Sequence, residues 1–370
     1  MTNVCVLGFG CVANQDNIFI MKGLLTEAGY DLVDSPEKAE VVVIGTCTVK
    51  LTTENKMRSL IVSVKDKKLV ITGCMPQAQK KLCEDIAPDA SLVNTCHIKN
   101  IVEVVENLLQ NKKSLKLGFE KEVKLGLPKI IKDKNIATVQ IAEGCRGKCT
   151  FCIVKLAKGE IVSYPQEKIV QEISSLVDKG YTKILLTAQD TAAYGLDLDK
   201  KSQLPSLINE ICKIDKKFIL RVGMMNPMHV VDITEELIES FKDEKIFKFL
   251  HVPIQSGSDK VLRDMARPVT VEQFKTIVKL FRNNFPGMSI ATDVIVGYPT
   301  ETEDDFKQTV ALVKELKFEV FNISKFTPRP GTKASELKPL NTKISKKRSA
   351  ELDKLFKSYS PVLGSKISTN

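Results

Sequence analysis

Three cysteines in the segment EGCRGKCTFC carry the clearest chemical pattern in this sequence. Cys145, Cys149 and Cys152 have the spacing C-x3-C-x2-C, which brings three thiolates together in one short stretch. Three ligands without a fourth suit a 4Fe–4S cluster that leaves one iron open for substrate, whereas a structural zinc ion takes four closed ligands. No fourth cysteine or histidine lies nearby in the sequence, so we expect such a cluster, with zinc as the alternative.

A second set of three cysteines lies near the N-terminus. Cys11, Cys47 and Cys74 occur in GFGCVAN, GTCTVK and TGCMPQ, each directly after a different predicted strand. Loops that follow parallel strands meet at one edge of the sheet, so these three soft ligands would converge there and again leave one site open. The alternative is coincidence, because cysteine is a common small buried residue. The other cysteines have no partner at a ligand spacing, and we expect them to serve packing: Cys5, Cys83, Cys96 and Cys212.

Alternating strands and helices are expected to position both sets. Over residues 1–110, short β-branched runs alternate with helix-length amphipathic segments, which predicts a small doubly wound domain with a parallel sheet. The expected strands are Asn3–Gly8, Glu40–Ile44, Leu69–Thr72 and Ser91–Val93, and the expected helices are Asp16–Ala28, Thr52–Val64, Gln77–Ile86 and Ile98–Leu109.

The pattern changes after this domain. Residues 111–134 contain eight lysines with glycine and proline between them, which predicts a basic linker. Six further strands are predicted within residues 135–340, and six consecutive βα units favour a partial (β/α)6 barrel, whose functional residues would lie at the carboxyl ends of the strands. Residues 341–370 are basic and predict a helical tail.

The composition excludes several classes of protein. The chain has 370 residues, of which 43% are hydrophobic and 27% are charged, and from its short, interrupted apolar stretches we expect neither a membrane-spanning helix nor a signal peptide. We therefore expect no membrane partner and a cytoplasmic location, where ten cysteines stay reduced and serve metal or redox chemistry. The net charge of +10 favours a polyanionic partner, with solubility as the alternative.

Taken together, these motifs resemble the radical S-adenosylmethionine methylthiotransferases, most closely their archaeal and eukaryotic tRNA threonylcarbamoyladenosine branch. The resemblance runs from Cys11 to about Ala334. Besides the two cysteine sets, the blocks that carry it are LTAQDTAAYG, RVGMMNP, HVPIQSGSDKVLRDMARPVT, TDVIVGYPTETEDDF and FTPRPGTKA.

The resemblance implies a transferase with two 4Fe–4S clusters. Cys145, Cys149 and Cys152 would hold the cluster that binds S-adenosylmethionine, and no catalytic group beyond this bound cofactor is expected. Reductive cleavage of the cofactor would remove the hydrogen from carbon 2 of the adenosine next to the anticodon, at position 37 of tRNA. Cys11, Cys47 and Cys74 would hold the second cluster as carrier or donor of sulfur, and a second S-adenosylmethionine would supply the methyl group of the 2-methylthio product. The electron donor and the sulfur source are not identified by the sequence.

Polar residues and turns at the ends of barrel strands are expected to bind the cofactor. The alternative is that the glycine only shapes a turn and that the arginine only pairs with a carboxylate. These candidates are Gln189, Asp190, Arg221, Gln255, Ser256, Val296 and Gly297. Three arginines are weaker candidates for contacts with nucleic-acid phosphate: Arg263, Arg267 and Arg329.

The sequence departs from the family pattern in two places. Family members continue into a C-terminal TRAM β-barrel, and this chain reaches Asn370 without such a run of strands, so we expect the barrel to be absent or cut off. Lys158 also stands where many relatives have arginine. Two other functions remain open. One is methylthiolation of another tRNA adenosine or of a ribosomal-protein aspartate, and the other is a non-catalytic iron–sulfur protein that binds tRNA.

Overall fold

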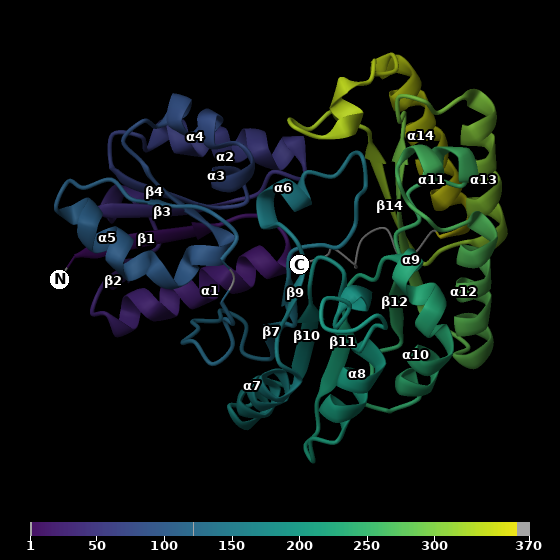
Figure 1. Ribbon diagram of the computed structural model, residues 1–370, viewed down its shortest axis with the longest axis horizontal. Helices are drawn as coiled ribbons and strands as arrows, with labels where there is room; N and C mark the ends of the chain where they lie inside the picture. Colours follow the sequence, from purple (N-terminus) through teal and green to yellow (C-terminus); the bar gives the residue numbers. More distant parts are fainter. Residues whose placement is uncertain (1, 121, 361–370) are drawn as a thin grey trace. The chain divides into compact units, whose positions relative to one another are not determined.

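The computed structural model describes residues 2–120 and 122–360, and two compact units can be distinguished in it (Figure 1). The first unit runs to Cys145 and resumes over Ile153–Tyr181. The second unit consists of Arg146–Cys152 and the chain from Thr182 onward. The segment Arg146–Cys152 therefore belongs to a different unit from the residues on either side of it.

A six-stranded parallel sheet forms the framework of the first unit. Its strand order is β2-β1-β3-β4-β5-β6. Strand β3 is buried along its whole length, as expected for a central strand of a sheet that is covered on both faces. The strands are β1 (Asn3–Gly8), β2 (Asp31–Val33), β3 (Val41–Thr46), β4 (Lys68–Gly73), β5 (Ser91–Asn94) and β6 (Leu115–Lys116).

Helices cover both faces of this sheet, because alternate residues of a strand point to opposite faces. Val4 and Val6 of β1 pack in one apolar core with α1 and α5, whereas Cys5 packs in the other with α2, α3 and α4. This arrangement confirms the predicted doubly wound parallel sheet. The helices are α1 (Val12–Glu27), α2 (Leu51–Ser63), α3 (Met75–Ala78), α4 (Lys80–Ile86) and α5 (Ile101–Leu109), with short 3-10 turns η1 (Pro36–Lys38) and η2 (Thr95–Asn100).

The rest of the first unit contains a short antiparallel pair of strands. In this pair β8 (Ala142–Glu143) lies beside β9 (Val162–Ser163). Three other elements belong to this part of the unit: β7 (Ile136–Gln140), α6 (Val154–Lys158) and α7 (Gln166–Asp178).

The second unit contains parallel strands alternating with helices. Strand β10 pairs with β11, and β12, β13 and β14 form a second parallel set; one bridge, between Leu220 and Ile246, extends β11 toward β12. The strands are β10 (Lys183–Thr187), β11 (Ile219–Val222), β12 (Phe249–His251), β13 (Ser289–Val296) and β14 (Val320–Lys325). The helices are α8 (Leu204–Cys212), α9 (Pro227–Val230), α10 (Thr234–Phe241), α11 (Asp259–Asp264), α12 (Val271–Asn284), α13 (Glu303–Leu316) and α14 (Thr342–Tyr359), with 3-10 turns η3 (Thr191–Ala193), η4 (Val231–Ile233) and η5 (Lys333–Glu336).

Helix α14 occupies the first part of the segment expected to form a basic tail. Arg348 on this helix is buried, and its guanidinium pairs with the buried Glu301 at 2.6 Å. Residues 361–370 of the expected tail lie outside the described residues. None of the helices in the described part of the chain is long and apolar enough to cross a membrane.

The structure differs from the predicted elements in short or irregular segments. Strands β2 and β6 were not predicted, because two or three residues carry no periodic signal. The helix expected over Gln77–Ile86 is divided into α3 and α4, since Gln79 has a non-helical backbone between them. The α/β class with parallel sheets is confirmed, while the domain boundaries stay a prediction.

We predict that Gly73→Ala weakens the first unit. Gly73 has a φ of +96°, and a Cβ there would lie against the carbonyl oxygen of Thr46 on the neighbouring strand. The strained backbone alone should lower the free energy of unfolding by about 1–3 kcal/mol, and the clash with backbone adds to this loss. Chemical denaturation followed by circular dichroism measures the change.

The control is Gly29→Ala, because Gly29 has a similar φ of +85° with no atom within 4 Å of its added Cβ. It should lose only the contribution of backbone strain. Equal losses in the two variants would contradict the role given to the contact with Thr46.

Candidate functional site

Three cysteines of the first unit follow three neighbouring strands. Cys11 follows β1 and stands at the N-cap of α1, Cys47 follows β3, and Cys74 follows β4 and stands at the N-cap of α3. Strands β1, β3 and β4 are consecutive in the sheet. Because parallel strands end at the same edge, the structure brings the three loops to one edge, as the sequence predicted.

Hydrogen bonds and close packing hold these loops together. The Cys74 N–H donates to the Thr46 carbonyl at 3.0 Å. Asn14 Nδ2 donates to the same carbonyl at 3.0 Å and lies 3.8 Å from Cys74 Sγ. A Cβ at Gly10 would lie 3.0 Å from the Cβ of Cys47, so glycine lets the first two loops approach.

The thiols at this edge influence one another electrostatically. Burial raises the pKa of Cys74 to about 12, the ammonium of Lys158 acts to lower it, and charge on Cys11 and Cys47 acts to raise it. Cys47 and Cys74 are buried, whereas Cys11 is exposed, so the edge is accessible from one side. Three thiolates here would repel one another and require a positive partner, which iron would supply.

The donor set suits an iron–sulfur cluster. Within the part of the chain that the structure describes, no three His, Cys, Asp or Glu side chains are arranged to hold a single metal ion. Cysteines that bind a cluster attach to different irons, so they stand further apart than the ligands of one ion. Three thiols on adjacent loops are a donor set that could hold a cluster.

A buried charge group lies in the same unit. Glu143 on β8 accepts from Lys124 Nζ at 2.6 Å, and its other oxygen lies 3.7 Å from Lys158 Nζ; all three side chains are almost completely buried. Burial opposes ionisation of Glu143, but the two lysines outweigh it and lower its pKa. Burial lowers the pKa of Lys124. For Lys158 burial is the largest single effect, but the combined attraction of Glu143 and of nearby cysteines outweighs it and raises the pKa.

Sequence reasoning missed this group. Lys124 lies in the segment expected to be a basic linker, and nothing in a lysine-rich run distinguishes a buried lysine from an exposed one. Lys158 was noted only as a departure from the family pattern. Glu143 directly precedes Gly144 and Cys145, and this position beside a ligand motif was the one available signal.

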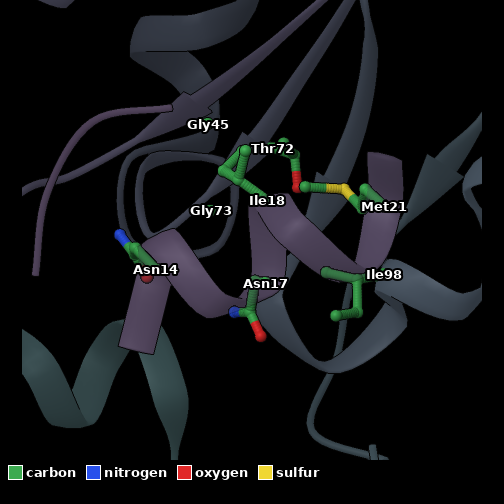
Figure 2. A pocket seen from close by; sticks show the side chains of 8 residues that line it. All are labelled: Asn14, Asn17, Ile18, Met21, Gly45, Thr72, Gly73 and Ile98. Carbon is green, nitrogen blue, oxygen red and sulfur yellow. The ribbon is translucent and has the colours of Figure 1, made fainter. Parts of the chain in front are cut away.

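A small cavity lies beside the cysteine loops, between α1 and the sheet (Figure 2). Its volume of about 10 Å³ holds about one water molecule, far too little for a cofactor. Asn17 Nδ2 and Thr72 Oγ1 on its wall are buried without a hydrogen-bond partner among the described residues. The lining residues are Asn14, Asn17, Ile18, Met21, Gly45, Thr72, Gly73 and Ile98.

The C-x3-C-x2-C segment spans the division between the units. On the side of the first unit, Cys145 is half-buried and its N–H donates to the Gly159 carbonyl at 3.1 Å. On the side of the second unit, Cys149 and Cys152 are half-buried, and the Cys152 N–H donates to the Cys149 carbonyl at 3.1 Å.

Arg267 is a buried cation beside this segment in the second unit. Its Nη1 lies 3.6 Å from Cys149 Sγ, and its Nη2 donates to Asn226 Oδ1 at 2.8 Å and to the Pro253 carbonyl at 2.6 Å. The expectation that Arg267 contacts phosphate at a surface is wrong, because its side chain is directed inward. Arg329 is also buried, whereas Arg263 is exposed.

Three of the expected cofactor contacts are partly exposed. Gln189 follows β10, and Gln255 has a φ of +80° after β12. Within the described part of the chain, Arg221 on β11 has no carboxylate pair of the kind considered for it. Its guanidinium lies 4.4 Å from the ring centre of Phe249, and burial lowers its pKa. A contact of these three residues with the cofactor stays a prediction.

Asp190 has its hydrogen bonds within the second unit. One carboxylate oxygen accepts from the N–H groups of Ala192 and Asn226, and the other lies 2.7 Å from Nδ1 of His229. His229 was not among the predicted site residues, although it lies only two residues after the RVGMMNP block. The structure thus gives Asp190 a bracing role for η3 and α9.

The other expected contacts lie in the interior. Ser256 and Val296 are fully buried, and Ser256 Oγ accepts from the Ser258 N–H at 3.2 Å. Gly297 has a φ of +76°, and its N–H donates to Glu301 at 2.6 Å. The Gly297 N–H is thus satisfied within the protein, and a cofactor contact at these three positions stays a prediction.

Comparison with known proteins gives matches to two family models and to named relatives. The Radical SAM superfamily matches residues 139–313, and uncharacterized protein family UPF0004 matches residues 3–93. A protein of Pyrococcus horikoshii named as a probable threonylcarbamoyladenosine tRNA methylthiotransferase is 39% identical over 96% of this chain and 84% of its own length. A threonylcarbamoyladenosine tRNA methylthiotransferase of Xenopus laevis is 38% identical over 95% of this chain and 65% of its own length.

The chain belongs to the threonylcarbamoyladenosine tRNA methylthiotransferase family. This confirms the predicted resemblance and identifies the chain as an enzyme of the transferase class with a radical S-adenosylmethionine domain. A solved structure of the radical methyltransferase TsrM from Kitasatospora setae matches with a TM-score of 0.68 over 90% of this chain and 77% of that one, at 13% identity, which supports the fold. The superfamily implies one 4Fe–4S cluster and S-adenosylmethionine.

We predict that Arg267→Leu destabilises the second unit and weakens retention of iron at Cys149. The variant removes hydrogen bonds from a buried charged donor, each worth about 1.5–3 kcal/mol, and leaves the Pro253 carbonyl without this donor. Denaturation of the purified protein and its iron content after reconstitution measure the two effects. Arg263→Leu, at an exposed position of the preceding helix, is the control and should change neither value. An Arg267→Leu protein that is as stable as the wild type and keeps its full iron content would contradict the role given to Arg267 beside Cys149.

Proposed function

We propose that this enzyme converts threonylcarbamoyladenosine at position 37 of tRNA, next to the anticodon, to its 2-methylthio derivative. The observation that carries the proposal is 39% identity over 84% of a relative named for this modification. The net charge of +10 suits a polyanionic substrate. The domain arrangement proposed with it is a methylthiotransferase domain over residues 1–110, a linker over 111–134, a radical S-adenosylmethionine barrel over 135–340 and a tail over 341–370.

In this proposal Cys145, Cys149 and Cys152 hold the cluster that binds S-adenosylmethionine. When bound, the cluster and cofactor supply one-electron cleavage of the sulfonium and removal of hydrogen from carbon 2 of the base. The protein's own contribution is position and charge. Arg267 supports the assignment, because its guanidinium lies 3.6 Å from Cys149 Sγ and is held in place by Asn226 and the Pro253 carbonyl. Gln189, Arg221 and Gln255 are proposed to contact the cofactor with their side chains.

Cys11, Cys47 and Cys74 are proposed to hold a second 4Fe–4S cluster that carries or donates sulfur. Their loops end three adjacent parallel strands, and two of the three thiols are buried. In the overall reaction the C2–H bond is replaced by a C2–S–CH3 group. One S-adenosylmethionine would take up one electron from an external donor and the C2 hydrogen atom and leave as methionine and 5′-deoxyadenosine. The electron released when carbon joins sulfide-level sulfur would return to the iron, and a second S-adenosylmethionine would give its methyl group to sulfur. The electron donor, the sulfur source and a cytoplasmic location, where thiols stay reduced, belong to the proposal.

We predict two clusters for each chain. Anaerobic reconstitution should give about eight irons in the wild type and about four in the variant Cys145→Ala/Cys149→Ala/Cys152→Ala. Iron and acid-labile sulfide analyses measure this. Cys212→Ala is the control, since this cysteine belongs to neither set and should leave the iron content unchanged. About four irons in the wild type and none in the variant would restrict the protein to one cluster.

We predict that the two cysteine sets divide the reaction between them. Cys11→Ala, Cys47→Ala or Cys74→Ala should leave reductive cleavage of S-adenosylmethionine largely intact and abolish sulfur insertion into tRNA. Chromatography of the cleaved cofactor and mass spectrometry of nucleosides from tRNA containing threonylcarbamoyladenosine measure the two activities. Loss of cleavage in these variants would contradict the division. Cleavage by the wild type without modification of this tRNA would contradict the proposed substrate and favour another adenosine or a ribosomal-protein aspartate.

A further inference from the structure

Lys158 occupies an unusual place for a lysine in the first unit. It is the last residue of α6, and its side chain is only 2% exposed. Helix α6 packs against α3, the short helix that begins directly after Cys74 (Figure 1). The next residue, Gly159, turns the chain with a φ of +66°, and its carbonyl accepts from the Cys145 N–H at 3.1 Å. A tightly held backbone thus places this buried side chain at the edge with the cysteine loops.

The ammonium of Lys158 is incompletely satisfied by the protein. Its Nζ has no hydrogen-bond partner among the described residues, and it lies 3.7 Å from Glu143, which Lys124 holds at 2.6 Å. An ammonium group has three donors, and burying it without partners is unfavourable. The groups whose charge acts on Lys158 besides Glu143 include Cys74 and Cys11. Because α6 packs against α3, which begins directly after Cys74, the cysteine loops lie near these open donors.

The charges of Lys124, Lys158 and Glu143 also do not balance one another. Lys124 and Lys158 both approach the single carboxylate of Glu143, so the group carries one positive charge in excess when both lysines are protonated, although burial lowers the pKa of Lys124. A buried excess charge is unfavourable unless an opposite charge lies nearby. A 4Fe–4S cluster held by three thiolates is an anion, and it would supply that opposite charge at this edge.

We infer that Lys158 is the counter-charge of an iron–sulfur cluster at Cys11, Cys47 and Cys74 and that it makes this cluster easier to reduce. The inference rests on the proposed second cluster. Reduction adds negative charge, and a nearby buried cation stabilises the reduced form more than the oxidised form. Lys158 is thus a positioning residue that acts on the potential of the cluster, while the cysteines bind the iron.

The test uses the full chain in the background Cys145→Ala/Cys149→Ala/Cys152→Ala, so that only the cluster of the first unit is observed. The midpoint potential is measured by redox titration followed by electron paramagnetic resonance. Lys158→Met should lower the equilibrium constant for reduction at least tenfold, a negative shift of about 59 mV or more for a one-electron couple. Lys158→Arg keeps the positive charge and should stay close to the background protein.

The matched control is Lys155→Met, which removes the same charge from the same helix. Lys155 is partly exposed and pairs with the exposed Glu160 at 2.7 Å, so its loss should shift the potential little. Equal potentials for Lys158→Met and Lys155→Met would overturn the inference. Failure of the background protein to bind iron would instead refute the proposed second cluster.

A folding check and a second variant distinguish a change in potential from a failure of the variant to fold. Circular dichroism of each variant before reconstitution reports whether it is folded, and Lys158→Gln keeps a polar head group if Lys158→Met does not fold. An unshifted potential in a folded Lys158→Gln protein overturns the inference. A folded Lys158→Met protein that no longer binds iron, with binding restored in Lys158→Arg, supports the counter-charge directly.

Discussion

Parallel pairing is the constraint on which the candidate chemistry of the first unit depends. The strands of a parallel sheet all have their carboxyl ends on the same side of the sheet. Because helices cover both faces, the loops at the two ends of the strands are the parts left open to bind ligands. The order β2-β1-β3-β4-β5-β6 makes β1, β3 and β4 neighbours, so Cys11, Cys47 and Cys74 meet without any proximity in sequence. The short loops can approach because Gly10 and Gly73 adopt positive φ values that other residues avoid.

Buried charge is the second organising feature of this unit. Lys129 contacts Asp16 at 3.1 Å and Glu172 at 3.0 Å, and Lys124 contacts Glu143 at 2.6 Å. Removing these ions from water is costly, and breaking one partner of such a pair would leave an uncompensated charge. The two lysines therefore hold the segment of residues 111–134 against the rest of the unit, although a lysine-rich segment of this kind is usually exposed to solvent.

These cases show which features the sequence could predict. Long β-branched runs and amphipathic helices carry their own periodicity, so the parallel sheet and the cysteine loops were foreseen from local pattern alone. The burial of Lys124, Lys158 and Arg267 depends on partners far away in the chain, and a charged residue is by itself most often exposed. Asp190 likewise has the position expected of a ligand contact, yet its hydrogen bonds go to Asn226 and His229, which no local pattern could indicate.

A buried cation accompanies each set of cysteines, and the two cations differ in a way that fits the proposed roles. The guanidinium of Arg267 is held by Asn226 and the Pro253 carbonyl, so it presents a rigid charge to Cys149. Lys158 has open donors and a longer contact with Glu143. A rigid cation suits a cluster that always binds the same cofactor. An ammonium on a flexible stem can follow changes in charge, and a cluster that gains and loses anionic sulfur in each reaction cycle would require this property.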